Sequence, residues 1–312
     1  MTICIVACCT ESDSFIVAGD RLFSYGGGYS YESISLKRIP ITADRRWHTM
    51  FAGDVSNVLP IIRRVRADLG SRRPSYRLEL VERACIQAYQ AHREQLVNDR
   101  ILSTYGTDLE TYRGEGVNFG AQECARINSR IESVEVGVDF IIYGYDDLNF
   151  AHLFTLHETV DPPFEIKSTD RDQDGIAVIG CGDKYALASL LSSELPIRSQ
   201  AEMLCRVCEA KFEAEKDKDV GRDSAAGVVN KPRSSVNGTS ESFIALAALQ
   251  AIRDAHIQGQ DRPYPKELLN ALMYCINSNI TTERMAQAVF RAEQEIIEEN
   301  RRRRAKGEPL SD

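Results

Sequence analysis

The sequence predicts an α+β fold in which two stacked sheets lie between helical layers, a four-layer αββα sandwich with a C-terminal helical extension. Two observations predict this fold. Strand-like runs alternate with pairs of helical segments, rather than with single helices as in a parallel βαβ sheet. Beyond residue 242 only helical periodicity remains. We therefore expect one large domain at 2–242 and a helical extension at 243–312.

The predicted strands begin with a hairpin at the N-terminus. Residues 2–9 and 14–19 are rich in strand formers and are joined by a polar Thr-Glu-Ser-Asp turn. The glycines at 26–28 lack the Gly-Lys-Ser/Thr ending of a phosphate-binding loop, so they indicate a hairpin loop. Further strand-like runs lie at 35–42, 47–52, 136–145, 151–160, 164–168 and 175–180.

The predicted helices follow from apolar residues at helical spacing. The polar stretch 103–134 indicates an insertion or an embellished helix connection. The stretch 217–242 is rich in Asp, Lys, Ser and Gly, which indicates a loop or a broken strand. Helical segments lie at 55–69, 78–102, 184–195, 200–216, 243–257, 266–277 and 281–304.

The composition is that of a globular protein, with 43% hydrophobic and 27% charged residues among 312. The net charge of −8 argues against a nucleic-acid partner, because phosphate neutralisation needs a basic face. The basic run Arg301–Arg304 follows acidic residues and is interpreted as a solvated helix end. The first residues lack the features of a secretory signal and are too short to cross a bilayer. We therefore expect a cytoplasmic protein with no membrane partner.

Cysteine usage agrees with that expectation. The chain has nine cysteines, an odd number, and most lie inside apolar runs, which is typical of reduced thiols in a cytosol. Cys205 and Cys208 have no second Cys/His pair at zinc spacing. We interpret them as a buried pair on one helix face, and we expect no metal or other cofactor.

Thr2 follows the initiator methionine and begins the first strand-like run. If Met1 is removed, Thr2 combines a nucleophile and a base in one residue. Its hydroxyl can attack, and its α-amino group, with an ordinary pKa of about 8, can take the proton directly or through a water. The alternative is that Thr2 is only the first residue of an edge strand, and position alone favours that alternative.

Further motifs favour the interpretation of Thr2 as a nucleophile over a purely structural one. In order, the chain contains Ala18-Gly19-Asp20, Lys37 in Ser-Leu-Lys-Arg-Ile, Phe51-Ala52-Gly53-Asp54, Ile141–Asp147 followed by Ala151-His-Leu-Phe, and Val178–Ala188. Together these motifs, spread over residues 2–190, resemble the proteasome β-type family of N-terminal nucleophile hydrolases. That family includes the peptidase subunit of the bacterial two-component protease and the Anbu proteins, whose chains also open with Met-Thr-x-Cys.

The resemblance implies a role for each matching residue. Thr2 matches the nucleophile, and Asp20 matches a strand-end carboxylate. Lys37 matches the lysine that this carboxylate holds charged near the hydroxyl, although Arg38 is a second candidate because the register could slip by one. Gly53 matches the glycine whose backbone N–H faces the oxyanion, a donor that typically contributes about 2.7–4 kcal/mol.

Cys181 departs from the family pattern. It stands where the family usually has a serine near the terminal amine, and a thiol is a weaker donor and acceptor. The aspartate that partners this serine matches Asp223 by spacing, with Asp217 and Asp219 as rivals. Cys4, two residues along the strand, is the one nearby alternative to Thr2 as nucleophile.

The resemblance also implies a function and its partners. We expect an N-terminal threonine hydrolase that cleaves peptide or unfolded-protein substrates inside a homo-oligomer, with an ATPase as a possible partner. Two alternatives stay open: a catalytically inactive structural or binding subunit of the same fold, and a non-peptide amidohydrolase. The state of the N-terminus and labelling of residue 2 by a threonine-directed electrophile discriminate between them.

Overall fold

The computed structural model describes most of the chain up to residue 278. The predicted helix at 281–304, the basic run at 301–304 and the glycine loop at 26–28 lie outside the described residues. The residues described are 2–9, 13–20, 22–25, 29–32, 37–70, 76–115, 119–159, 165–192, 199–232, 240–244, 246–257, 264 and 266–278.

The chain forms two compact units, each built on a five-stranded sheet. The first unit comprises Met1–Phe23, Tyr31–Arg38 and Asp174–Asp312. The second unit comprises Ser24–Ser30 and Ile39–Gln173. A separate two-stranded sheet joins β3 (Leu22–Tyr25) to β4 (Tyr29–Glu32).

The sheet of the first unit has the strand order β10-β1-β2-β11-β12, and all four neighbouring pairs are antiparallel. The predicted N-terminal hairpin is present as its centre, with Cys4 opposite Gly19. The strands are β1 (Ile3–Cys9), β2 (Ser14–Asp20), β10 (Ile176–Gly180), β11 (Ser224–Asn230) and β12 (Ser240–Phe243).

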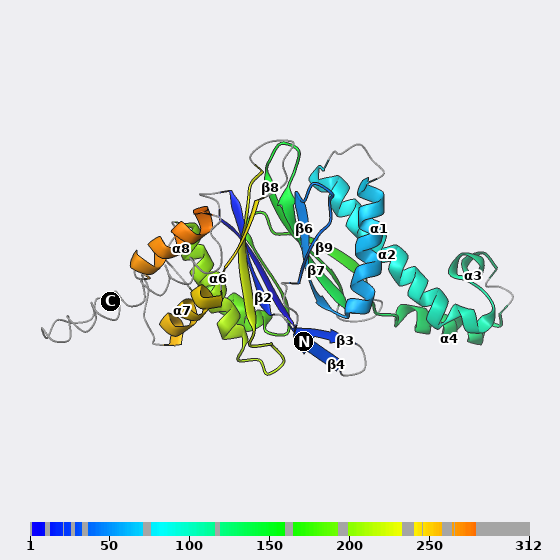
Figure 1. Ribbon diagram of the computed structural model, residues 1–312. Helices are drawn as coiled ribbons and strands as arrows, with labels where there is room; N and C mark the ends of the chain where they lie inside the picture. The colour runs from blue at the N-terminus through cyan, green and yellow to red at the C-terminus, as the bar shows by residue number, and fades with distance from the viewer. Residues whose placement is uncertain are drawn as a thin grey trace, which may run out of the picture. The chain divides into compact units, whose positions relative to one another are not determined.

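Helices cover this sheet from one side. Helix α6 packs on β1, β2 and β11, and α5, α7 and α8 pack on α6 or on neighbouring strands (Figure 1). Because side chains alternate along a strand, every second residue of β1 and β2 enters the core with α6, including Ile3, Ile5, Ile16 and Ala18. The helices are α5 (Asp183–Leu191), α6 (Gln200–Ala214), α7 (Leu246–Ile257) and α8 (Lys266–Ser278).

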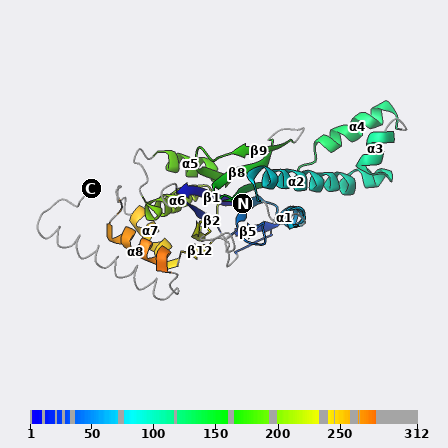
Figure 2. The ribbon, with the colours of Figure 1, turned by 90° about the horizontal axis from the view of Figure 1, so that it is seen from above.

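The sheet of the second unit has the order β5-β6-β7-β8-β9, and the β6–β7, β7–β8 and β8–β9 pairs are antiparallel. Helices α1 (Val55–Gly70) and α2 (Leu78–Arg100) pack against it. A short 3₁₀ helix, α3 and α4 follow at the far end of α2 (Figures 1 and 2). The remaining elements are β5 (Arg38–Pro40), β6 (Trp47–Gly53), β7 (Val138–Tyr145), β8 (Ala151–Glu158), β9 (Ile166–Asp170), η1 (Leu102–Tyr105), α3 (Leu109–Glu115) and α4 (Ala121–Glu132).

The α+β class with two antiparallel sheets flanked by helices is confirmed. The described residues of the stretch 103–134, expected to be an insertion or an embellished helix connection, are largely helical. One segment differs from expectation. Residues 224–230, expected to be a loop or broken strand, form β11, which pairs with all seven residues of β2. Strand β11 is buried and begins with four small residues, so it lacks the apolar alternation that identifies a half-exposed strand. These residues are Ser224, Ala225, Ala226 and Gly227.

Among the described residues, no helix combines the length and apolar character needed to cross a membrane.

Candidate active site

Thr2 lies immediately before β1, in the first unit, and is almost fully buried at 5% exposure. Its carbonyl accepts a hydrogen bond from the Cys181 N–H at 3.0 Å, just beyond the end of β10. Gly180 ends β10 with φ +109°, and a Cβ there would lie 1.8 Å from the Thr2 carbonyl oxygen. Only glycine allows this close approach of the two backbones. The end of β10 therefore fixes the main chain of Thr2.

Lys37 joins Thr2 to Asp20. The Lys37 ammonium donates a hydrogen bond to the Thr2 hydroxyl oxygen and another to Asp20 Oδ1, at 3.1 Å from the ammonium nitrogen. Asp20 is the last residue of β2 and is completely buried, and Lys37 is 2% exposed. A buried charge needs a partner, and here lysine and aspartate are partners for each other. The predicted ion pair is therefore present, and it contacts the Thr2 hydroxyl.

The electrostatics of the pair suit activation of a hydroxyl. Burial raises the pKa of Asp20 above its ordinary value, while the charge and hydrogen bond of Lys37 and the Gly221 N–H oppose that rise. A cation that donates to a hydroxyl oxygen stabilises the negative charge that develops there when the proton leaves. Thr2 thus carries a hydroxyl whose oxygen is polarised by a buried ammonium.

Cys181 lies beside the Thr2 backbone, as the sequence comparison implied. Burial raises the pKa of the Cys181 thiol, a hydrogen bond with the Thr2 backbone lowers it, and the charges of Asp217 and Asp219 raise it further. Asp223 is exposed in the turn before β11. Among the three candidate aspartates, Asp217 and Asp219 thus raise the pKa of the Cys181 thiol, and the role of Asp223 remains a prediction.

The remaining candidates are Gly53, Cys4 and Arg38. Gly53 belongs to the second unit, where it ends β6 with φ +106°. Its proposed role as oxyanion donor remains a prediction. Cys4 is buried within β1, opposite Gly19 and Ile179. Arg38 begins β5 and is half-buried, whereas its neighbour Lys37 makes the contacts with Thr2 and Asp20.

Sequence reasoning missed two residues near Asp20. The Gly221 N–H donates to Asp20 Oδ2 at 3.2 Å, and Lys211 of α6 donates to the Gly221 carbonyl at 2.7 Å. A signal for Lys211 was available. With Leu204, Val207 and Cys208 it forms a stripe at helical spacing, so a lysine occupies a position that the periodicity assigns to the core.

No protein-family model and no curated protein matches the chain. Solved structures do match. The Anbu complex from Pseudomonas aeruginosa, solved as a helical assembly, is 12% identical, with 84% of this chain and 98% of that chain aligned and a TM-score of 0.53. Anbu from Hyphomicrobium sp. strain MC1 is 13% identical, with 85% and 99% aligned and a TM-score of 0.50.

The chain has the fold of the proteasome-like N-terminal nucleophile hydrolases. The fold class and the resemblance predicted from the sequence are confirmed. Eukaryotic HslV from Trypanosoma brucei is 14% identical, with 74% of this chain and 99% of that chain aligned and a TM-score of 0.41. Identity this low shows the fold alone, so the role of each residue of this proteasome-like chain has to be argued from its own geometry.

Proposed function

We propose that this proteasome-like chain is an N-terminal threonine hydrolase that cleaves peptide bonds. One observation supports this most strongly: the buried Lys37 ammonium donates to the Thr2 hydroxyl while it is paired with buried Asp20. A structural threonine at the start of a strand needs no buried cation on its hydroxyl. A nucleophilic threonine does, because the alkoxide-like oxygen must be stabilised as it forms.

The proposed reaction begins with removal of Met1, which frees the Thr2 amine. The Thr2 hydroxyl oxygen then attacks the substrate carbonyl carbon, its proton passes to the amine, and Lys37 stabilises the charge on the oxygen. The tetrahedral intermediate collapses when the C–N bond breaks and the leaving amine takes that proton. Water hydrolyses the resulting ester and regenerates Thr2. The Gly53 N–H is proposed as a donor to the oxyanion. Cys181 and one aspartate, Asp223 or its rivals Asp217 and Asp219, are proposed as groups near the amine.

We also propose that the chain works as a homo-oligomer in the cytoplasm. The Pseudomonas aeruginosa Anbu protein forms a helical assembly, which supports self-association of a chain with the same fold. In this proposal residues 2–242 form the hydrolase domain, with an insertion at 103–134, and residues 243–312 form a helical extension. A chamber formed by many copies would restrict a reactive terminus to peptide or unfolded-protein substrates, with an ATPase as a candidate partner.

The experiment measures hydrolysis of a library of fluorogenic peptides together with the mass of the N-terminal fragment. We expect turnover only in protein that begins at Thr2. Thr2→Ala removes the hydroxyl and should abolish turnover, whereas Thr2→Ser keeps hydroxyl and amine and should retain part of it. The matched control is Thr42→Ala, a buried threonine of the second unit. Full activity in protein that still carries Met1 would contradict the mechanism and direct attention to Cys4 or Cys181.

A further inference from the structure

Lys211 is a buried lysine that the reaction above does not use. It lies on α6 and is completely buried. Burial lowers its pKa, although the hydrogen bond and charge of Glu215 oppose that effect. An isolated buried ammonium costs several kcal/mol, roughly, so such a residue is expected only where partners compensate for it. The partners of Lys211 lead directly to Asp20.

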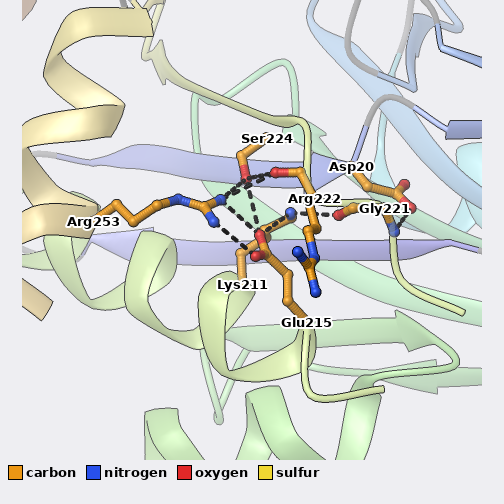
Figure 3. A network of polar contacts seen from close by, with 7 residues as sticks. All are labelled: Asp20, Lys211, Glu215, Gly221, Arg222, Ser224 and Arg253. Atoms are coloured by element: carbon orange, nitrogen blue, oxygen red, sulfur yellow. Dashed lines mark hydrogen bonds and ion pairs between the residues drawn. The ribbon is translucent and has the colours of Figure 1, made fainter. Parts of the chain in front are cut away.

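Gly221 is held between Lys211 and Asp20. The Lys211 ammonium donates to the Gly221 carbonyl at 2.7 Å, and the Gly221 N–H donates to Asp20 Oδ2 at 3.2 Å. Figure 3 shows this chain of contacts running from α6 through the loop before β11 to the end of β2. Asp20 belongs to the same strand face as Ile16 and Ala18, which pack on α6, so it points toward the helix that carries Lys211.

Glu215 and Arg253 complete the network. Lys211 also donates to the Glu215 carboxylate. Arg253 of α7 donates to both oxygens of the same carboxylate, each at 2.8 Å, and to the Arg222 carbonyl at 3.0 Å (Figure 3). Its guanidinium also lies over the Phe212 ring, 4.3 Å from the centroid. Arg253 therefore ties the helix beyond β12 to the loop that contacts Asp20.

The charges of this network do not cancel. Lys211 and Arg253 are two cations that share the single carboxylate of Glu215. Among these three side chains one positive charge is left over, and beyond Gly221 lies the buried carboxylate of Asp20, whose pKa Lys211 lowers. Lys37 contacts both Asp20 and the Thr2 hydroxyl, so a second cation behind Asp20 helps to hold the carboxylate ionised and in place.

We propose that Lys211 is a positioning residue for the Thr2 site: through Gly221 it holds Asp20 ionised and aimed at Lys37, and Arg253 supports it from the C-terminal extension. This inference rests on the proposed function, since it names what maintains the Asp20–Lys37 pair. Through Arg253, the inference gives the C-terminal extension a role in supporting the Thr2 site of its own subunit.

The proposal predicts opposite effects for two substitutions. The charged groups that surround Asp20 in the network are Lys37 from the segment before β5, Lys211 from α6, Glu215 from the residue that follows α6, and Arg253 from α7. Lys211→Met removes a positive charge and should raise the pKa of Asp20, whereas Glu215→Gln removes a negative charge and should lower it. A purely structural role would not produce shifts of opposite sign.

The first measurement is the rate at which a β-lactone acylates Thr2, followed by intact mass as a function of pH. The rate should fall in two steps toward acid, first when the amine takes a proton and then when Asp20 does. Lys211→Met should move the second step up by about one pH unit, which makes acylation about tenfold slower below that step. Arg253→Met should move it less in the same direction, and Glu215→Gln should move it down.

Lys216→Met is the matched control, because Lys216 lies just beyond α6 and pairs with Glu213 at the surface. It should leave the profile unchanged. Equal shifts in Lys211→Met and Glu215→Gln, or none in either, would overturn the inference even if the wild-type chain is acylated normally. A wild-type chain that is not acylated would contradict the proposed function instead.

A second measurement tests the inference without activity. A double-mutant cycle combines Lys211→Met with Asp20→Asn and uses equilibrium unfolding of the full chain at neutral pH. If Lys211 stabilises ionised Asp20, Lys211→Met should be less damaging in the Asp20→Asn background, with a coupling of about fivefold or more in the unfolding equilibrium constant. Additive effects would overturn the inference. Glu215→Gln replaces Lys211→Met in the cycle, with coupling of opposite sign, if the latter variant does not fold.

Discussion

Each unit of the molecule contains a strand-to-helix corner with the same backbone geometry. In the first unit, Gly180 ends β10 with φ +109°, and the Thr2 carbonyl oxygen occupies the place that a Cβ would take. The next residue, Cys181, donates its N–H to that carbonyl at 3.0 Å, and α5 follows.

In the second unit, Gly53 ends β6 with φ +106°, and the carbonyl oxygen of Gly137 lies where its Cβ would be, at 2.1 Å. Asp54 donates its N–H to that carbonyl at 3.2 Å, and α1 follows. The two corners therefore share their backbone geometry, from the glycine to the helix.

The side chains around the two corners differ. At Thr2 a buried ammonium, paired with Asp20, donates to a hydroxyl. At Gly137 the Glu158 carboxylate accepts the N–H groups of Val136 and Gly137, at 2.9 Å and 3.2 Å. One set of charges polarises a hydroxyl, and the other satisfies backbone donors. The backbone corner is the same in both units, so the charged side chains beside it determine whether the site can support catalysis.

The largest expected effect is on turnover at the Thr2 corner. Lys37→Met removes the cation from the Thr2 hydroxyl, and we expect turnover to fall about 10²–10⁴-fold. The substitution also leaves Asp20 buried without its cation, so the variant should be compared with Lys37→Met combined with Asp20→Asn, which removes both charges. Peptide hydrolysis by single and double variants should be equally low, while the double variant should be the more stable in urea. An active single variant would transfer the role to Arg38 or refute it.

The shared backbone can be tested by breaking both corners in the same way. Gly180→Ala and Gly53→Ala each place a Cβ against a carbonyl oxygen at positive φ, so each should destabilise the fold by about 2–4 kcal/mol. Gly114→Ala is the control, because no atom lies within 4 Å of its added Cβ. Denaturation midpoints check this, and a tolerated Gly180→Ala would mean that the close approach to Thr2 is not required.

A smaller effect is expected at the carboxylate of the second corner. Burial raises the pKa of Glu158, while hydrogen bonds from Gly137 and Val136 lower it. Glu158→Ala leaves these N–H groups without their acceptor, so we expect a loss of about 1–3 kcal/mol in the free energy of unfolding. Chemical denaturation measures it. No loss of stability would show that the carboxylate is not needed to satisfy this backbone.

The smallest expected effect is on the pH dependence of the free energy of unfolding, through His152 of the second unit. Burial lowers the pKa of His152, but hydrogen bonds and charges from Asp172 and Asp146 raise it above the ordinary value overall. Folded His152 therefore binds its proton more tightly than unfolded His152. Its contribution is fully present below about pH 6.5 and is lost as the pH rises through the folded pKa. We expect a decline of about 1 kcal/mol or less, smaller in Asp172→Asn because Asp146 still acts on His152, when unfolding is measured against pH.

The sequence predicted the parts of this molecule that depend on local pattern. The hairpin of β1 and β2, the helices α1, α2 and α6, and the Asp20–Lys37 pair beside Thr2 follow from periodicity and from the order of the family's motifs. The strand β11 did not, because Ser224-Ala-Ala-Gly227 owes its conformation to burial between β2 and the helices rather than to its own propensity.

The network behind Asp20 was also beyond sequence reasoning. Lys211, Glu215 and Arg253 come from two helices, and only tertiary packing shows that the three meet (Figure 3). The lysine in the apolar stripe of α6 was the one local sign of it. Asp223 was preferred over Asp217 and Asp219 by spacing, and its role near the amine remains a prediction.

The central claim is that Thr2 carries both the nucleophile and the base, and one measurement tests it most directly. A peptide epoxyketone reacts with both groups of a terminal threonine, because its ketone adds the hydroxyl and its epoxide is opened by the amine. After incubation, peptide mapping by mass spectrometry should place a single adduct on a chain that begins at Thr2, with none on Thr2→Ala and little on Lys37→Met. An adduct on Cys4 or Cys181, or an unlabelled chain that begins at Thr2, would contradict the account.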